Sequence, residues 1–463
     1  MSPTNLSIAS AVIWDKLSAT QQQAVLERPA QKASTDLMAQ VKNIVEQVAA
    51  QGDQALIQLT AKFDQVTLAS VVLDMPKVRE LAEQTDAHVK RAIDQAYANI
   101  YAFHAAQQPQ PVRMQTVPGV WCEQRFAPLD KVGLYIPGGS ASLPSTVLMC
   151  GIPAQIAGCR ERILISPPNV DAALTPAICY AALKCEVTQV CLSGGAQAIA
   201  ALALGTDTIP AVDKIVGPGN SYVTAAKQYV SQLPGGPAID LPAGPSELLI
   251  IADDTADPIF VAADLLSQAE HGPDSQVILL SPSARLVEAT RHELAKQLSQ
   301  LPRAAVTAQA LQSSSLVVTS DLEQAAYISQ RYAPEHLSLQ IDNAEAWIDR
   351  TNQAGSVFVG HYAPESGGDY ATGTNHVLPT YGYARSYSSL GLADFYRRYT
   401  VQQLSPQGLQ ALAPTIMALA AEEKLDAHLQ AVQLRLSSQR MLDDLTNLDA
   451  NPALTNDLNQ GTL

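Results

Sequence analysis

The chain has 463 residues, of which 47% are hydrophobic and 16% charged, as in ordinary soluble globular proteins with two or three hydrophobic cores. Its 29 Lys and Arg stand against 44 Asp and Glu, a net charge of −15, which argues against nucleic acid or an anionic membrane as a partner. No apolar stretch approaches the ~20 residues that span a bilayer, and the chain start lacks the features of a signal peptide, so we expect a cytoplasmic protein.

Short runs rich in β-branched residues alternate with helical stretches through the middle and later parts of the chain. We expect strands at residues 162–166, 187–193, 247–252, 276–281, 315–319, 336–340 and 356–360. Helical stretches of about ten to fifteen residues separate many of these runs, a pattern typical of parallel sheets wrapped by helices. The sequence therefore predicts an α/β fold.

Six cysteines, at positions 122, 150, 159, 179, 185 and 191, form no C-x-x-C pair and no zinc-finger spacing. One of them could act as a nucleophile. Their mostly apolar surroundings instead favour small buried side chains in a reducing compartment. We assign none of them to catalysis.

Two glycine-rich segments are candidates for binding the phosphates of a cofactor. Gly194 and Gly195 precede a helical run and offer backbone N–H groups there, although such pairs often form only turns. In GPGNSY, Gly217 and Gly219 are spaced as the first two glycines of the dinucleotide fingerprint, but Tyr222 stands where the third belongs. The fingerprint alone therefore does not predict NAD binding.

A helix is expected at residues 256–266, with Asp257 as its N-cap and Pro258 at its first position. The string SQAEHGPDSQV follows and places Gln268 and His271 three residues apart, on one face of the helix C-terminus, before Gly-Pro ends the helix. A cation held by these two side chains would lie near the negative end of the helix dipole. The alternative is an ordinary polar helix end.

Further polar groups come later in the chain. Glu335 and His336 lie between a proline and a predicted strand, where successive side chains point in different directions. A histidine and a carboxylate suit proton transfer, although such a pair can also be a plain surface dipeptide. Asp369 follows two glycines, a flexible bend that would present the carboxylate from a loop, or would let it bond to the backbone of its own turn.

Glu423 and His428 are five residues apart and cannot share a face of one straight helix. If Asp426 is the N-cap of a new helix, His428 lies in its first turn. A single histidine at a helix start is more often structural than a ligand.

Long strings across the chain resemble histidinol dehydrogenases, over about Val12 to Arg440. They are YIPGGSASLPSTVLM (135–149), VGPGN (216–220), LPAGPSE (241–247), SQAEHGPDSQV (267–277), YAPEHL (332–337), PESGGDYATGTNHVLPTYG (364–382) and EKLDAH (423–428). The resemblance implies a zinc-containing, NAD-dependent enzyme that oxidises L-histidinol through L-histidinaldehyde to L-histidine.

The resemblance also implies an architecture of two Rossmann-like α/β domains, one inserted in the other, with an N-terminal helical arm (1–28) and a C-terminal helical tail (391–440) that embraces the partner in a homodimer. The segments YIPGG and LPAGPSE flank the inserted NAD domain, which we place at 135–245. The main domain, with the metal and substrate, would then be residues 29–134 and 246–390. Residues 441–463 are polar and acidic, and we expect them to be disordered.

The resemblance implies one zinc ion per subunit, held by Gln268, His271, Asp369 and His428. This is a set of two nitrogens and two oxygens in which manganese or cobalt could substitute. The same four residues would contact the substrate, together with Ser246, His336 and Glu423. Glu423 and His428 would come from the other subunit, so that dimerisation completes the site.

The roles that the resemblance implies are a general base at His336 and a carboxylate at Glu335 that activates water. Zinc would position the substrate by its amino and imidazole nitrogens. NAD would contact Tyr135, Gln197 and Asn220. Three alternatives stay open at this point: a related zinc dehydrogenase of another small primary alcohol, a zinc amidohydrolase with Glu335 as base, and a non-catalytic scaffold.

Overall fold

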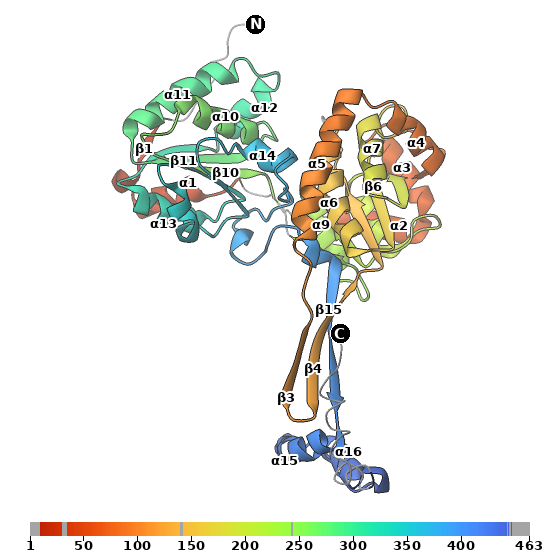
Figure 1. The fold of residues 1–463 in the computed structure, drawn as a ribbon. Helices are drawn as coiled ribbons and strands as arrows, with labels where there is room; N and C mark the ends of the chain where they lie inside the picture. The colour runs from red at the N-terminus through yellow and green to blue at the C-terminus, as the bar shows by residue number, and fades with distance from the viewer. Residues whose placement is uncertain are drawn as a thin grey trace. The chain divides into compact units, whose positions relative to one another are not determined.

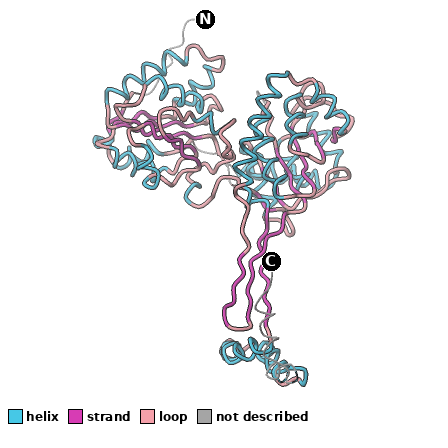
Figure 2. The backbone as a smooth tube through the Cα atoms, in the orientation of Figure 1, coloured by secondary structure: helices cyan, strands magenta, loops and turns pink. Residues whose placement is uncertain are grey.

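The computed structural model describes residues 10–29, 35–138, 142–241, 244–441, 443 and 446. Within this part of the chain, two six-stranded sheets and one three-stranded sheet are present. Helices enclose each of the larger sheets, as the strands in magenta and the helices in cyan show in Figure 2. The predicted α/β fold with parallel sheets is confirmed.

The first sheet is entirely parallel. Its strands, in spatial order, are β1 (Val12–Ile13), β12 (Ser315–Val318), β11 (Gln276–Ser281), β10 (Glu247–Ala252), β13 (His336–Gln340) and β14 (Ser356–Val359). Three of the predicted strands, those beginning at 247, 276 and 336, have the predicted bounds. Those at 247 and 276 contain continuous apolar runs, and all three are buried along their whole length, as expected of strands covered on both faces.

Both faces of this first sheet are covered by helices (Figure 1). Leu248 and Ile250 of β10 pack against α10 (Pro258–Ala269), α11 (Ala284–Leu298) and α12 (Ala304–Leu311). Leu249 and Ile251 point to the opposite face, where α1 (Ala19–Leu26) and α13 (Leu322–Tyr332) lie. This alternation follows from the two-residue repeat of a strand. The predicted N-terminal arm thus adds strand β1 and helix α1 to this sheet, and residues 1–9 lie outside the described part.

The second sheet has the order β2 (Val72–Leu73), β7 (Gln189–Leu192), β6 (Glu161–Ser166), β5 (Lys131–Tyr135), β8 (Lys214–Val216), β9 (Ala238–Ile239). Its strands are parallel apart from β2, which runs antiparallel to β7. The helices around it are α2 (Thr35–Gln51), α3 (Asp53–Phe63), α4 (Met75–Glu83), α5 (Ala87–Ala105), α6 (Pro144–Ala157), α7 (Pro176–Lys184), α8 (Gly195–Leu204) and α9 (Ser221–Ser231).

The packing of the early helices differs from the predicted domain boundary. Leu37, Val41 and Leu56, from α2 and α3, belong to one core with Ile163 of β6, and α4 packs against α7. Residues 35–105 therefore accompany the second sheet, whereas the predicted boundary placed residues 29–134 in the metal and substrate domain. The reason is that an apolar helix face shows that a helix is packed, but does not identify the sheet it covers.

A second compact unit contains the described residues of 109–127 and 396–446. In it, strands β3 (Val112–Val117) and β4 (Val120–Pro128) form an antiparallel hairpin, and β15 (Tyr396–Leu404) lies beside β4. Helices α15 (Pro406–Glu422) and α16 (Asp426–Leu436) follow β15 and pack together. The tail predicted to be helical from residue 391 therefore begins with a short 3-10 helix, η4 (Leu392–Phe395), and a strand, before its two α-helices. Of residues 441–463, which were predicted to be disordered, residues 441, 443 and 446 are described and are helical, and the others lie outside the described residues.

The turn of this hairpin contacts the start of α15. The N–H of Ser405 donates to the carbonyl of Gly119 in the hairpin turn, and the Ser405 side chain caps α15 by accepting from the N–H of Gly408. A Cβ atom at Gly408 would lie 2.4 Å from the Gly119 carbonyl oxygen, so only glycine permits this approach.

Among the described residues, no helix is both long enough and apolar enough to cross a membrane.

Candidate functional site

The polar residues of the predicted metal and catalytic site gather at the amino edge of the first sheet. Strands β10 and β13 begin there with Glu247 and His336, because neighbouring parallel strands start at the same edge. Helix α10 runs back from the end of β10 and brings Gln268 and His271 to this edge. The site therefore lies opposite the carboxyl edge at which open α/β sheets usually bind ligands.

Helix α10 forms as the sequence predicts. Asp257 is its N-cap, with the side chain accepting from the N–H of Ile259 at 2.8 Å, and Pro258 is its first residue. Gln268 lies in the last turn and is fully buried. His271 follows the helix end, and its side chain is 43% exposed.

Asp369 lies in a short helix, α14 (Glu365–Tyr370), and not in a loop as predicted. The two glycines before it serve close packing, since a Cβ atom at Gly368 would lie 2.7 Å from the ring of Phe358. Because α14 is helical, Glu365 lies one turn before Asp369 on the same face. The sequence analysis missed Glu365, although its spacing of four from Asp369 could have revealed it once a helix was assumed.

Three of these side chains could hold one metal ion. His271, Glu365 and Asp369 each offer a ligand atom, all within 4.8 Å of one another, and His271 Nε2 lies 3.8 Å from Asp369 Oδ2. Burial raises the pKa of Asp369, and the neighbouring Glu365 carboxylate raises it further. A cation between these groups would remove that unfavourable interaction.

The neighbouring buried atoms fit a zinc ion as well. Both polar atoms of the Gln268 amide, and Oε1 of Glu365, are buried without a hydrogen-bond partner in the described structure. Buried polar groups in proteins nearly always have a partner, so unpaired atoms beside three candidate ligands fit the binding of a cation at this place. Nitrogen and oxygen donors of this kind suit zinc.

The predicted catalytic pair is buried, not a surface dipeptide. His336 Nδ1 lies 3.5 Å from Glu335 Oε2 and donates to the carbonyl of Glu247 at 3.0 Å, while its Nε2 faces Asp369 Oδ1 at 3.9 Å. Burial lowers the pKa of His336, but the Glu335 carboxylate, with Glu365 and Asp369, raises it to about 10 in the metal-free protein. A bound cation would act against these carboxylates.

His376 also lies at this site and was not predicted. Its Nδ1 is 2.8 Å from the carbonyl oxygen of Asp369, and its Nε2 is 3.3 Å from the Thr146 hydroxyl of α6. Burial lowers the pKa of His376 to about 4.

Ser246, predicted to contact substrate, is half-buried just before β10, and its carbonyl accepts from the N–H of Gln276.

The predicted NAD residues line a cavity of about 680 Å³ in the second sheet's domain. Tyr135 ends β5, Gln197 lies in the first turn of α8, and Asn220 caps α9 by accepting from the N–H of Val223. The cavity lies at the carboxyl edge of this sheet, where the chain order reverses between β5 and β8, a position where α/β sheets commonly bind cofactors. Gly194 and Gly195 line it at the start of α8.

Glu423 and His428 belong to the other compact unit. Glu423 ends α15 and His428 lies in the first turn of α16, and both are exposed. The predicted cap is off by one residue, because Asp426 is the first helical residue and Leu425 precedes it as the N-cap. The structure thus brings His271 and Asp369 together in one unit and places His428 in the other.

The six cysteines are free thiols, and all but Cys122 are buried. Burial raises the pKa of Cys179 to about 11 and of Cys159 and Cys191 to about 12, so these thiols stay protonated and unreactive. Burial acts in the same direction on Cys150 and Cys185. The assignment of no cysteine to catalysis agrees with this environment.

Comparison with known proteins gives one family from sequence and from structure. The histidinol dehydrogenase family model matches residues 26–436. A histidinol dehydrogenase of Idiomarina loihiensis is 57% identical over 426 residues, 92% of this chain and 96% of that protein. One from Vibrio vulnificus is 53% identical over 425 residues, 92% of this chain and 98% of that protein. The crystal structure of histidinol dehydrogenase from Elizabethkingia anophelis matches with a TM-score of 0.88 and 45% identity, over 92% of this chain and 97% of that one.

Proposed function

Because this chain belongs to the histidinol dehydrogenase family, and so catalyses the NAD-dependent oxidation of histidinol to histidine, we propose how its own residues carry out that reaction. The family uses zinc and NAD, and the group of His271, Glu365 and Asp369 is compatible with a metal ion. The alternatives of another alcohol, an amidohydrolase and a scaffold are therefore set aside.

We propose that Gln268, His271, Asp369 and His428 hold the zinc ion. The observation that carries this proposal is the unpaired, fully buried Gln268 amide beside the clustered His271 and Asp369. When bound, zinc supplies an anchor for the amino and imidazole nitrogens of histidinol. Ser246 and Glu423 complete the substrate contacts, and Glu365 adds negative charge next to the ligands.

His336 is the general base in this proposal. Its Nδ1–H is engaged by the carbonyl of Glu247 at 3.0 Å, which leaves the lone pair on Nε2 to accept a proton. In the first oxidation, Nε2 would take the hydroxyl proton of histidinol, while a bound NAD would accept the hydride. After His336 releases this proton to solvent, Glu335 would take a proton from the water that attacks the aldehyde. His336 would then take a hydroxyl proton again, and a second NAD would accept the second hydride.

Tyr135, Gln197 and Asn220 bind NAD in the cavity of the second domain. Two features support this: all three line one cavity, and helix α8 begins at this cavity, where the positive end of its dipole favours a phosphate. The Tyr135 hydroxyl accepts from the N–H of Gly195 at 3.2 Å, so the tyrosine also holds the glycine turn in place.

We further propose that the chain is a homodimer joined through the unit of residues 109–127 and 396–446. Large apolar side chains of this unit are exposed, among them Met114 (53%), Leu419 (59%) and Leu434 (69%). Exposed apolar surface of this kind marks an interaction site. Glu423 and His428 lie in the same unit, so a partner's copy of it supplies both to the zinc site.

We also propose a cytoplasmic location, which the six free thiols support.

Mixing two inactive variants tests the shared site. We expect His428→Ala and Gln268→Ala each to lose zinc and turnover alone. When equal amounts are dissociated and re-formed, a dimer with one chain of each kind has one intact site, so about a quarter of the sites should recover. Reduced nicotinamide absorbance with histidinol as substrate, and zinc content, are the measurements.

The control pair is Gln268→Ala with His271→Ala. Gln268 and His271 are contributed to a site by the same chain. Each site of a mixed dimer therefore lacks one of these two ligands, and no recovery is expected. Absence of recovery in the first mixture as well, with mixed dimers present by mass spectrometry, would show that the site lies within a single chain.

A further inference from the structure

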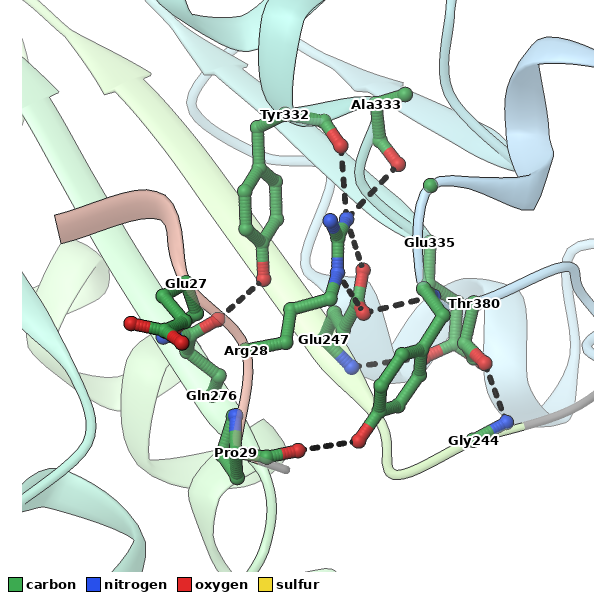
Figure 3. A network of polar contacts seen from close by, with 12 residues as sticks. Glu27, Arg28, Pro29, Gly244, Glu247, Gln276, Tyr332, Ala333, Glu335 and Thr380 are labelled. Carbon is green, nitrogen blue, oxygen red and sulfur yellow. Dashed lines mark hydrogen bonds and ion pairs between the residues drawn. The ribbon is translucent and has the colours of Figure 1, made fainter. Parts of the chain in front are cut away.

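Arg28 is a buried guanidinium that follows α1 and contacts the amino edge of the first sheet. Its Nε lies 2.5 Å from Glu247 Oε1 and its Nη2 lies 3.0 Å from Oε2, a two-pronged ion pair in which the side chains are only 14% and 2% exposed. The guanidinium also lies 3.9 Å from the ring centre of Tyr332. Figure 3 shows this ion pair at the centre of a network of polar contacts.

The same guanidinium reaches a second segment. Its Nη2 donates to the carbonyls of Tyr332 at 2.7 Å and Ala333 at 3.3 Å, in the turn that leads directly into Glu335 and His336. Ala333 has φ +52, a left-handed conformation that is unfavourable for alanine and needs support from its surroundings. Arg28 therefore ties the start of β10 to the turn before β13 (Figure 3).

Glu247 links this ion pair to the catalytic pair through its own backbone. Its N–H donates to Glu335 Oε2 at 2.8 Å, and its carbonyl accepts from His336 Nδ1 at 3.0 Å. Its carboxylate also accepts from the N–H of Tyr381 at 2.8 Å. One residue thus holds both proposed catalytic side chains by its backbone, while its side chain is held by Arg28.

We infer that Arg28 is a positioning residue of the active site, which aligns Glu335 and His336 by fixing Glu247 and the turn at Tyr332 and Ala333. This inference rests on the roles proposed above for Glu335 and His336. Arginine suits the task because its planar fork reaches two carboxylate oxygens and a backbone carbonyl at once, which a lysine ammonium cannot do with the same geometry. A small displacement of catalytic groups is enough to slow a reaction strongly.

The test uses the zinc-loaded enzyme with Arg28→Lys, Arg28→Gln and Glu247→Gln. We expect kcat to fall about 10- to 100-fold in Arg28→Gln, as for catalytic groups that are slightly misplaced, with a smaller fall in Arg28→Lys. The KM values for histidinol and NAD and the zinc content should stay within about threefold, because Arg28 touches none of the proposed ligands or cofactor contacts. Oxidation of added histidinaldehyde should fall in parallel, since Glu247 holds both side chains.

Arg162→Gln and Arg162→Lys are matched controls. Arg162 is similarly buried, at 11% side-chain exposure. It donates to the carbonyls of Cys159 and Glu186 at the amino end of β6 in the second sheet, the end opposite the NAD cavity. These variants should lower the melting temperature without changing kcat. If Arg28→Gln does not fold, the same quantities are measured on Arg28→Lys and Glu247→Gln: kcat, the KM values, zinc content and melting temperature.

Unchanged kcat in folded Arg28→Lys and Glu247→Gln, with only the melting temperature lowered as in the controls, would overturn the inference. His336→Asn and Glu335→Gln separate this failure from failure of the proposed function. If these two lose turnover while the Arg28 variants keep it, only the positioning role is wrong. If they also keep turnover, the catalytic roles themselves are wrong.

Discussion

At the scale of single residues, the site combines side chains with complete and incomplete hydrogen bonding. Gln276 and Gln268 are equally inaccessible glutamines near the same edge of the first sheet. The Gln276 amide donates to the carbonyls of Glu27 and Ser313 and accepts from the Tyr332 hydroxyl at 2.8 Å. The Gln268 amide has no partner among the described residues. Hydrogen bonds within the protein account for the buried Gln276 amide, and a bound ligand accounts for the buried Gln268 amide.

Gln268→Met should therefore stabilise the zinc-free protein while removing its affinity for zinc. Replacing an unpaired buried amide by an apolar side chain of similar volume removes a desolvation penalty of about 1–3 kcal/mol. Urea unfolding in the presence of chelator measures the first effect, and metal analysis after zinc loading measures the second. Gln276→Met is the matched control and should destabilise, because it leaves three partners unsatisfied. Destabilisation by both changes would mean that Gln268 is paired in the metal-free protein.

His336→Asn should abolish most turnover but leave zinc bound. Asparagine can still donate to the Glu247 carbonyl but has no basic nitrogen, and loss of a general base typically lowers rate by ~10²–10⁴. Initial rates at saturating histidinol and NAD, with zinc content on the same sample, are the measurement. His292→Asn, an exposed histidine of α11, serves as control. A fall in zinc content would identify His336 as a ligand.

At the scale of elements, the loop between β8 and α9 is held by a buried ion pair. Lys227 of α9 and Asp240 lie 2.8 Å apart with side chains 5% and 1% exposed. Asp240 Oδ2 accepts from the N–H of Gly217 at 2.7 Å, and Lys227 Nζ donates to the carbonyl of Gly217. A Cβ atom at Gly217 would lie 2.0 Å from the carbonyl oxygen of Tyr135, so glycine is required there. Both backbone groups of this residue are therefore fixed three residues before Asn220.

Lys227→Met should weaken NAD binding selectively. The change leaves Asp240 buried without its cation and frees the loop that carries Asn220, so we expect the KM for NAD to rise about tenfold and stability to fall by ~3–5 kcal/mol. The KM for histidinol and the zinc content should not change. Lys214→Met is the control, because Lys214 is also a buried lysine, paired with Asp394 at 2.9 Å, but lies at the other end of β8. An equal rise in the KM for NAD in both variants would exclude a specific role for the loop.

At the scale of the whole molecule, buried neutral histidines make stability depend on pH. His104 of α5 is fully buried, with Nδ1 2.8 Å from the Ile100 carbonyl and Nε2 3.3 Å from the Asn375 amide, which itself donates to the carbonyl of Met149. Burial lowers the pKa of His104. The unfolded chain binds a proton below about pH 6.5 that the folded chain resists, so this contribution to stability is present above that pH and lost as pH falls.

His104→Gln should accordingly reduce the loss of stability between pH 7 and pH 5. Burial also lowers the pKa of His376, to about 4, so His376 makes a separate contribution of the same sign that this change leaves in place. Urea unfolding at the two pH values gives the difference. His88→Gln changes an exposed histidine of the same helix and should show the dependence of the parent protein. A pH dependence unaltered in His104→Gln would mean that His104 is already protonated in the folded protein.

Sequence reasoning predicted the strands with continuous apolar runs, because burial on both faces leaves an unmistakable pattern. It missed the hairpin of β3 and β4, where polar and apolar residues mix and the third strand comes from the far end of the chain. It also expected a loop at Asp369, since paired glycines usually break helices, whereas Gly368 there makes room for Phe358. Tertiary packing overrode the local preference in that case.

The site could be predicted only in part from local patterns. Spacing alone pointed to Gln268 and His271, while the roles of Asp369, His428 and the NAD residues came from the family resemblance. No local signal identified Arg28, because its partner Glu247 is more than 200 residues away in the chain. Contacts of this kind depend on how the strands are ordered in the sheet.

The three-stranded sheet has a consequence for the synthesis of the protein. The hairpin ends at Pro128, but the strand that completes it begins at Tyr396, about 270 residues later. At roughly 5–20 residues per second, a ribosome needs between about a quarter of a minute and a minute to deliver that strand. During this interval β4 has an open edge on the nascent chain, a surface that can pair with other polypeptides. Ribosome-associated chaperones are therefore most needed while the part of the message between Pro128 and Tyr396 is translated.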